Sequence, residues 1–231
     1  MSSLRAPRPP SGHGCSSRSP NPVRVVPWWG VVSSAAAPVL LVGGWTVAAG
    51  LQPRPVNLVS STISSLAAQG ATDRWVMTLA LLAVGVCDVV TGLALRPAAS
   101  PGRLILIAGG VAGVLVSANP EPARGGGSPQ HAFWAAIGFI ALTAWPIGGL
   151  RRGPSVPYGL RPAVSAVAAG AMLGLLVWFG AELLTRGGQV GLAERVLTEA
   201  QAVWPLAVVL TCWRSAVAAR MPPGGPGALT P

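Results

Sequence analysis

The sequence predicts an all-α, polytopic membrane protein: a bundle of six transmembrane helices with a short interfacial helix in its first outer loop. Six long apolar runs lead to this prediction, beginning near Val31, Trp75, Gly102, His131, Ala163 and Ala200. A hydrocarbon core of about 30 Å needs about 20 helical residues to span it, and a spanning helix satisfies its own backbone polar groups. The composition fits this class, because 51% of the 231 residues are hydrophobic and only 10% are charged, against roughly 25% charged in soluble domains.

The chain divides into three parts. Residues 1–27 and 220–231 form tails rich in proline and glycine, which we expect to be disordered, and residues 28–219 form the transmembrane domain. A secretory signal peptide is the alternative for the N-terminus, since Ala35-Ala36-Ala37 resembles a cleavage site. The apolar run continues to Gly50, however, so we expect an uncleaved first helix.

The net charge of +10 comes from arginine, because all 16 basic residues are arginines and lysine is absent. Binding to nucleic acid requires basic residues gathered on one folded surface. Here the arginines lie singly or in pairs between apolar runs, so we expect no nucleic-acid partner and interpret them as topology signals. The expected partners are membrane lipids, another membrane protein, and a small-molecule ligand that the sequence does not identify.

Arginine counts predict the orientation, since cytoplasmic loops carry an excess of basic residues. With the N-terminus inside, eleven arginines lie on the inner side: Arg5, Arg8, Arg18, Arg24, Arg96, Arg103, Arg151, Arg152, Arg161, Arg214 and Arg220. Five lie outside: Arg54, Arg74, Arg124, Arg186 and Arg195. This difference predicts a multi-pass protein of the cytoplasmic (inner) cell membrane with both termini in the cytoplasm.

Capping residues and glycine pairs predict where the helices begin and how they pack. Caps followed by proline or an acidic residue are expected at Ser100-Pro101, Ser128-Pro129, Arg161-Pro162 and Thr72-Asp73. Two glycine pairs with four-residue spacing, Gly109/Gly113 and Gly170/Gly174, predict close helix contacts inside the bundle, with a dimer interface as the alternative.

The loop from Leu51 to Asp73 contains a predicted short helix. Ile63, Leu66 and Ala67 form an apolar stripe with i, i+3, i+4 spacing, and Ser60 or Ser61 would cap it. Such a helix would lie on the bilayer surface or over the mouth of the bundle. The short helix is either a structural segment that docks on the bundle where the chain re-enters the membrane, or a functional lid.

Ionisable residues within the spans are functional candidates, because their burial in hydrocarbon is costly. Asp88 lies deepest, and it is either a proton or cation site or a neutral carboxyl group hydrogen-bonded to another helix. The other candidates gather at the predicted outer helix ends, where they would line an outward polar vestibule: Ser64, Asp73, Arg74, His131, Glu182 and Glu199.

The sequence does not indicate an enzyme class. His131 is the single histidine of the transmembrane domain, so we expect no metal and no cofactor. Cys15, Cys87 and Cys212 show no paired spacing. A serine hydrolase would need a nucleophile beside His131 and an orienting acid; Ser64 and Asp73 are conceivable, but no nucleophile elbow accompanies them. We therefore assign no catalytic residue and leave the enzyme question open.

The outer loop also resembles a known family. The relevant residues are SSTISSLAA (60–68), GATDRWVM (70–77), the Asn119-Pro120 turn and His131. In order and spacing they are similar to the actinobacterial branch of the membrane proteins grouped as domain of unknown function 998. The resemblance extends from Gly30 to Leu150 and, beyond that, to the helix count. It implies about six spans and no established activity, and this chain has Asp88 where we would expect a histidine.

Two functions are compatible with these features. The first is an integral membrane protein that binds or passes a small molecule, lipid or proton through the outward vestibule. The alternative is a non-catalytic accessory protein that stabilises a membrane complex through glycine-lined faces. A path that joins the outer polar residues to Asp88 would favour the first, and a closed bundle with an exposed stripe of small residues would favour the second.

Overall fold

The structure is a computed structural model that describes residues 25–123 and 127–219. Most of the predicted N-terminal tail and all of the C-terminal tail lie outside these residues. All regular elements in the described ranges are helices: α1 (Trp28–Gly50), α2 (Ile63–Ala67), α3 (Trp75–Ala94), α4 (Ser100–Ala118), α5 (Pro129–Gly149), the 3-10 helix η1 (Tyr158–Leu160), α6 (Pro162–Thr185) and α7 (Val190–Ala218). Six of them are long and apolar enough to cross a membrane, so the predicted fold class is confirmed.

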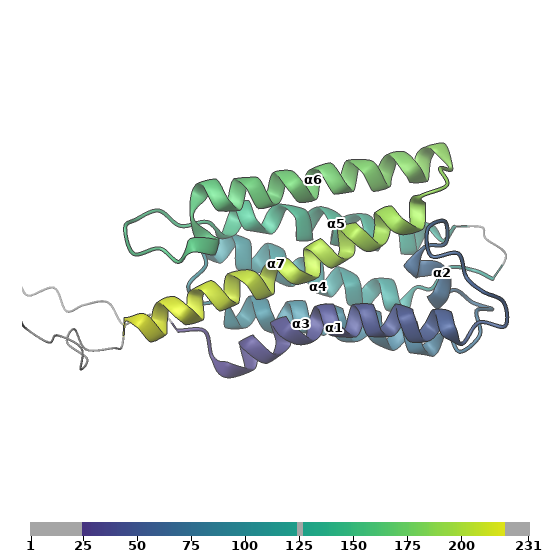
Figure 1. The fold of residues 1–231 in the computed structure, drawn as a ribbon, viewed down its shortest axis with the longest axis horizontal. Coiled ribbons are helices and arrows are strands. Elements are labelled where there is room, and N and C mark those ends of the chain that lie inside the picture. Colours follow the sequence, from purple (N-terminus) through teal and green to yellow (C-terminus); the bar gives the residue numbers. More distant parts are fainter. Residues whose placement is uncertain (1–24, 124–126, 220–231) are drawn as a thin grey trace, which may run out of the picture.

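The six long helices lie side by side along one direction (Figure 1). Helix α3 packs between α1 and α4, α4 packs between α3 and α5, and α7 contacts α1, α3, α5 and α6. Both ends of the described chain and η1 lie at one end of the bundle, here called the termini end, and α2 lies at the opposite, α2 end (Figure 1). Helix α6 packs mainly against α5 and α7, which leaves it at the periphery.

Helix α2 closes the bundle at the α2 end. The Thr62 side chain caps it by accepting a hydrogen bond from the Ser65 N–H group at 3.1 Å, so the cap is Thr62 rather than Ser60 or Ser61. Ile63 and Leu66 are each only 2% exposed and pack with Leu41, Met77 and their neighbours. Burying two such side chains contributes about 3–6 kcal/mol, enough to dock α2 onto the bundle.

Several predicted helix starts can be compared with the structure. The Ser128 cap is confirmed, since its Oγ accepts a hydrogen bond from the His131 N–H group at 3.3 Å. Proline occupies the first turn of α6, following Arg161 as predicted. Ser100, in contrast, lies inside α4 and makes no capping hydrogen bond. Arg74, rather than Thr72 or Asp73, occupies the cap position of α3.

Helix α7 begins ten residues before the predicted position, at Val190 instead of Ala200. Its 29 residues correspond to about 44 Å at 1.5 Å per residue. Glu194 and Arg195 interrupt the apolar run and so suggested a loop, yet they are only 4% exposed each. Glu194 accepts a hydrogen bond from the first residue of α2, Ile63, and Arg195 donates to carbonyl oxygens of the segment that leads into α2. Arg195 is therefore a buried structural residue and not a loop charge that reports topology.

The two glycine pairs differ in their surroundings. A Cβ atom on Gly109 would lie 2.8 Å from Leu142, and one on Gly113 would lie 3.4 Å from Gly85, so the α4 pair packs inside the bundle as predicted. A Cβ atom on Gly170 or Gly174 would meet nothing within 4 Å. The interpretation of the α6 pair as an internal contact is therefore wrong, because α6 is peripheral and turns these glycines away from its neighbours.

Candidate functional site: a polar cluster and cavity at the α2 end

Ser64, His131 and Glu194 form a hydrogen-bonded polar cluster at the α2 end, with one residue each from α2, α5 and α7. The Ser64 Oγ atom lies 3.1 Å from Nε2 of His131 and donates to Oε1 of Glu194 at 3.3 Å. His131 is 6% exposed and Glu194 is 4% exposed. Ser64 is thus the central member of the cluster, in contact with both the imidazole and the carboxyl group.

Backbone groups fix the two outer members of the cluster. Nδ1 of His131 lies 2.9 Å from the carbonyl oxygen of Asn119. Because a carbonyl oxygen can only accept, Nδ1 carries a hydrogen and Nε2 faces Ser64. Oε2 of Glu194 accepts a hydrogen bond from the Ile63 N–H group at 2.5 Å. Nε2 of His131 also lies 3.8 Å from Oε1 of Glu121, whose side chain is 33% exposed. The cluster therefore reaches the rim of the bundle.

Arg195 fastens the segment before α2 to α7. Its Nη1 atom donates to the carbonyl oxygens of Leu58, Ser61 and Gly191 at 2.8, 2.6 and 2.9 Å. Its guanidinium group lies 4.7 Å from the ring centroid of Trp45, at the distance of a cation–π contact. These contacts position α2, and with it Ser64, against Glu194.

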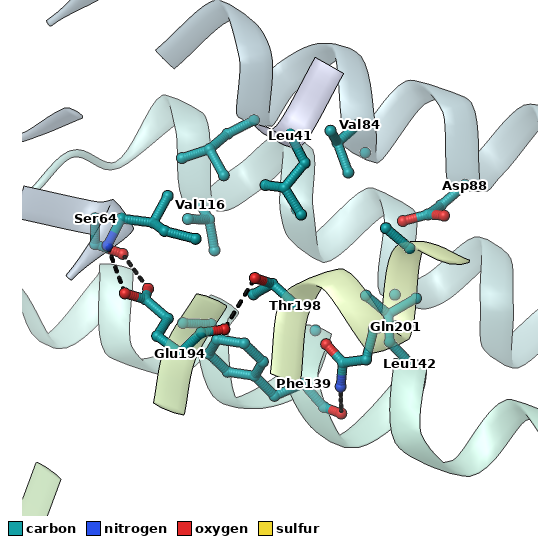
Figure 2. Close-up of a pocket in the computed structure, with 18 residues that line it drawn as sticks. Leu41, Ser64, Val84, Asp88, Val116, Phe139, Leu142, Glu194, Thr198 and Gln201 are labelled. Carbon is teal, nitrogen blue, oxygen red and sulfur yellow. Dashed lines mark hydrogen bonds between the residues drawn. The ribbon is translucent and has the colours of Figure 1, made fainter. Parts of the chain in front are cut away.

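A cavity of about 100 Å³ extends from the polar cluster into the bundle (Figure 2). Its walls are mostly apolar and come from α1, α2, α3, α4, α5 and α7. Five polar side chains line it: Ser64, Asp88, Glu194, Thr198 and Gln201. Figure 2 shows Ser64 and Glu194 at one end of the cavity and Asp88 at the other. The cavity thus joins the polar cluster to the deepest ionisable residue.

The far half of the cavity contains hydrogen-bond acceptors without partners among the described residues. Asp88 is 3% exposed, and no hydrogen bond from a described residue reaches its carboxyl group. The Gln201 amide nitrogen donates to the Phe139 carbonyl and to Oγ1 of Thr143, each at 3.0 Å, while its Oε1 atom is buried and unpaired. Because buried acceptors normally have a donor, these oxygens are suited to a ligand or to water.

The other four predicted vestibule residues lie apart from the cluster. Asp73 accepts a hydrogen bond from Nε1 of Trp75 at 3.2 Å and is exposed, as is the adjacent Arg74. Glu182 accepts from the Gln189 N–H group at 2.8 Å and so stabilises the turn between α6 and α7. Glu199 lies five residues after Glu194, about 140° around the helix, and lines a separate hollow beside Trp45. No hydrogen bond among the described residues joins Asp73 to His131, so Asp73 does not orient the imidazole.

Three of the five polar residues that line the cavity were not candidates from the sequence: Glu194, Thr198 and Gln201. They are spaced i, i+4, i+7 and therefore share one face of α7. This polar stripe is visible in the sequence, but Glu194 and Thr198 precede Ala200, where the sixth apolar run begins. In residues 25–123 and 127–219, no three His, Cys, Asp or Glu side chains are grouped so that they could hold a metal ion.

Comparison with known proteins identifies the family. No curated protein and no solved structure matches the chain. The model of the family described as "Protein of unknown function (DUF998)" matches residues 34–211, a range that includes the polar cluster and the whole cavity lining. This confirms the family that the sequence resembles, while the actinobacterial branch stays a prediction. The chain therefore belongs to the DUF998 family.

Proposed function

We propose that this multi-pass integral membrane protein binds a small, largely apolar molecule in the cavity and holds its hydrogen-bonding group at the polar cluster. The observation that supports this most is the single cavity that joins Ser64 and Glu194 to Asp88. Ligand sites are typically apolar pockets with a few convergent polar groups, as here. In the far half of the cavity, the unpaired Gln201 oxygen and the Asp88 carboxyl group would accept hydrogen bonds from a second polar group of the ligand, a hydroxyl or an amino group.

Helix α2 would act as the lid of this site. It carries Ser64, covers the mouth of the bundle and is held there by Ile63 and Leu66. The hydrogen bonds from Ile63 and Ser64 to Glu194 join the lid directly to a residue that lines the cavity. Movement of α2 would therefore open the cavity and alter the surroundings of Glu194 together.

Filling the cavity tests the proposal. Ala135 lines the cavity, whereas Ala136 on the same helix is exposed. Ala135→Leu is expected to lower the amount of bound small molecule about tenfold, since overpacking costs about 1–3 kcal/mol. The measurement is mass spectrometry of the small molecules and lipids released from protein purified out of native membranes. Ala136→Leu makes the same change on the outer face and should retain them.

A second candidate is the accessory role, which we propose on a different observation. Gly170 and Gly174 leave open space on the outer face of α6, where Val167 is 73% exposed and Leu173 is 53% exposed. A helix of another membrane protein could approach closely there. If Ala135→Leu and Ala136→Leu retain equal amounts of small molecule, or if the parent retains none, the cavity proposal fails and the accessory role is favoured.

We also propose that the protein lies in the cytoplasmic membrane, with the termini end in the cytoplasm and the α2 end outside. The arginine distribution supports this orientation. In a background without native cysteines, Gly188→Cys at the α2 end should react with an impermeant thiol reagent on intact cells. Ser155→Cys, at a position that is also exposed but lies at the termini end, should react only after permeabilisation. The reverse labelling pattern would invert the orientation.

A further inference from the structure

The hydrogen bonds of the polar cluster can be satisfied in two ways. In the first, His131 is an imidazolium: Nδ1–H donates to the Asn119 carbonyl, Nε2–H donates to Ser64, and Ser64 donates to a Glu194 carboxylate. In the second, His131 and Glu194 are both neutral: Ser64 donates to Nε2, and the protonated Oε1 of Glu194 donates to Ser64. The Asn119 bond and the bond from Ile63 to Oε2 are unchanged between the two.

We propose that His131, Ser64 and Glu194 form a proton relay between the rim of the α2 end and the cavity. In one transfer the Nε2–H bond breaks as a new Oγ–H bond forms, and the original Oγ–H bond of Ser64 breaks as an Oε1–H bond forms. The positive charge on the imidazole and the negative charge on the carboxylate disappear together. No heavy atom needs to move beyond hydrogen-bond distance, because both contacts already exist.

The relay has an entrance on the rim. Oε1 of Glu121 lies 3.8 Å from Nε2 of His131, and its side chain is 33% exposed. The carbonyl oxygen of Glu121 accepts a hydrogen bond from the Gln69 N–H group at 2.8 Å, so this residue is attached to the segment that follows α2. Once Glu194 has released its proton and again accepts the Ser64 hydroxyl, the lone pair on Nε2 of the neutral imidazole is free to take a proton from water beside Glu121.

The relay ends at Glu194, which lines the cavity. Thr198 and Gln201 continue from it along the same face of α7, and Asp88 lies on α3 at the far end. The remaining nearby charge, Arg195, points its Nη1 atom at three backbone carbonyls. The charged or titratable groups around the relay are therefore Glu121 at the rim, Arg195 on α7 and Asp88 across the cavity.

The order of the three residues separates this relay from a hydrolytic triad. In a triad the histidine is central, with the serine on one ring nitrogen and the acid on the other. Here the serine is central, and the second ring nitrogen binds a backbone carbonyl. A carboxylate 3.3 Å from Oγ would also oppose the oxyanion formed by attack of Ser64 on an ester. Proton transfer is thus the chemistry that this order supports.

Time-resolved infrared spectroscopy after a pH jump tests the relay, using the full-length protein in lipid nanodiscs. The carboxylic acid band of Glu194 is assigned by its loss in Glu194→Gln. Ser64→Ala is expected to slow the appearance of this band at least tenfold, since a positioned proton-transfer group contributes about 10²–10⁴-fold. Ser64→Thr retains a hydroxyl group and should restore most of the rate. This proposal does not depend on a ligand in the cavity.

Ser65→Ala is the matched control, because the Ser65 hydroxyl donates to the Thr62 carbonyl and lies outside the relay. Equal rates in Ser64→Ala and Ser65→Ala would overturn the proposal, as would the absence of a band that differs between the parent and Glu194→Gln. A further measurement needs no change in the cluster. In a His13→Gln protein, where His131 is the sole histidine, nitrogen NMR should show Nδ1 protonated throughout, and a tautomer protonated only at Nε2 would contradict the relay.

Discussion

Arg195→Leu is expected to lower the free energy of unfolding by about 3 kcal/mol or more, since each buried acceptor left unpaired costs about 1–3 kcal/mol. The substitution removes the donor to the carbonyls of Leu58, Ser61 and Gly191. It also removes the cation that stacks on Trp45. The measurement is thermal and denaturant unfolding of the purified protein in mixed micelles. Limited proteolysis should cut the segment before α2 sooner than in the parent.

Two further variants serve as controls for the unfolding of Arg195→Leu. Arg54→Leu makes the same chemical change at an exposed position of the segment between α1 and α2 that Arg195 binds, and it should alter stability by less than about 0.5 kcal/mol. Arg195→Lys should be intermediate, because an ammonium group keeps the charge but not the planar stacking group. If Arg195→Leu and Arg54→Leu unfold alike, Arg195 does not anchor the loop, and α2 must be held by Ile63 and Leu66 alone.

The six long helices were predictable from the sequence because a transmembrane helix needs only length and apolar composition, not particular residues at particular positions. Crossing about 30 Å of hydrocarbon demands a long apolar run, and the six runs are separated by proline, glycine and arginine. The docking of α2 was also visible in part, since the spacing of Ile63, Leu66 and Ala67 indicates one apolar face. Where that face packs depends on neighbours that are distant in the sequence, and Leu41 and Met77 became identifiable only in the fold.

The site was less predictable than the fold. Hydropathy averages over a window, so Glu194 and Arg195 made the start of α7 look polar. In the fold, however, Glu194 accepts a hydrogen bond from Ile63 and Nη1 of Arg195 donates to the Ser61 carbonyl, so both residues bind other parts of the protein. Ser64 and His131 were candidates from the sequence, and the fold brings them into contact across 67 residues. Asp73, Glu182 and Glu199 share only a predicted depth in the membrane. Depth alone does not determine which side of a helix a residue faces.

The two glycine pairs also show that a residue's position on one face of a helix does not predict what that face contacts. Four-residue spacing places two glycines on one face, but it does not indicate whether another helix covers that face. On α4 the glycine face lies between α3 and α5, whereas on α6 it faces away from the bundle. The two helices differ because α4 is packed between two neighbours, whereas α6 contacts mainly α5 and α7 and has one side free.

Gly102→Ala is expected to destabilise the bundle by about 1–3 kcal/mol, the usual cost of forcing extra atoms into a packed core. An added Cβ atom would overlap the backbone nitrogen and Cα atom of Gly149 and would lie 2.5 Å from the carbonyl carbon of Gly148. These are backbone atoms, so α4 and α5 must separate at the termini end. Separation would also strain the hydrogen bond from the Ala99 N–H group to the Gly149 carbonyl, which is 3.1 Å long.

Gly170→Ala provides the matched control for Gly102→Ala, because it makes the same change within a transmembrane helix where a Cβ atom meets nothing within 4 Å. Alanine is favoured over glycine in a helix interior by up to about 1 kcal/mol, so this variant should unfold at the same or a higher temperature than the parent. Opposite signs for the two substitutions, measured by thermal unfolding in the same micelles, are the expected result. A Gly102→Ala protein as stable as Gly170→Ala would mean that α4 and α5 do not pack backbone to backbone at this point. In that case α4 and α5 would have to lie farther apart at the termini end than the distances between Gly102 and Gly149 indicate.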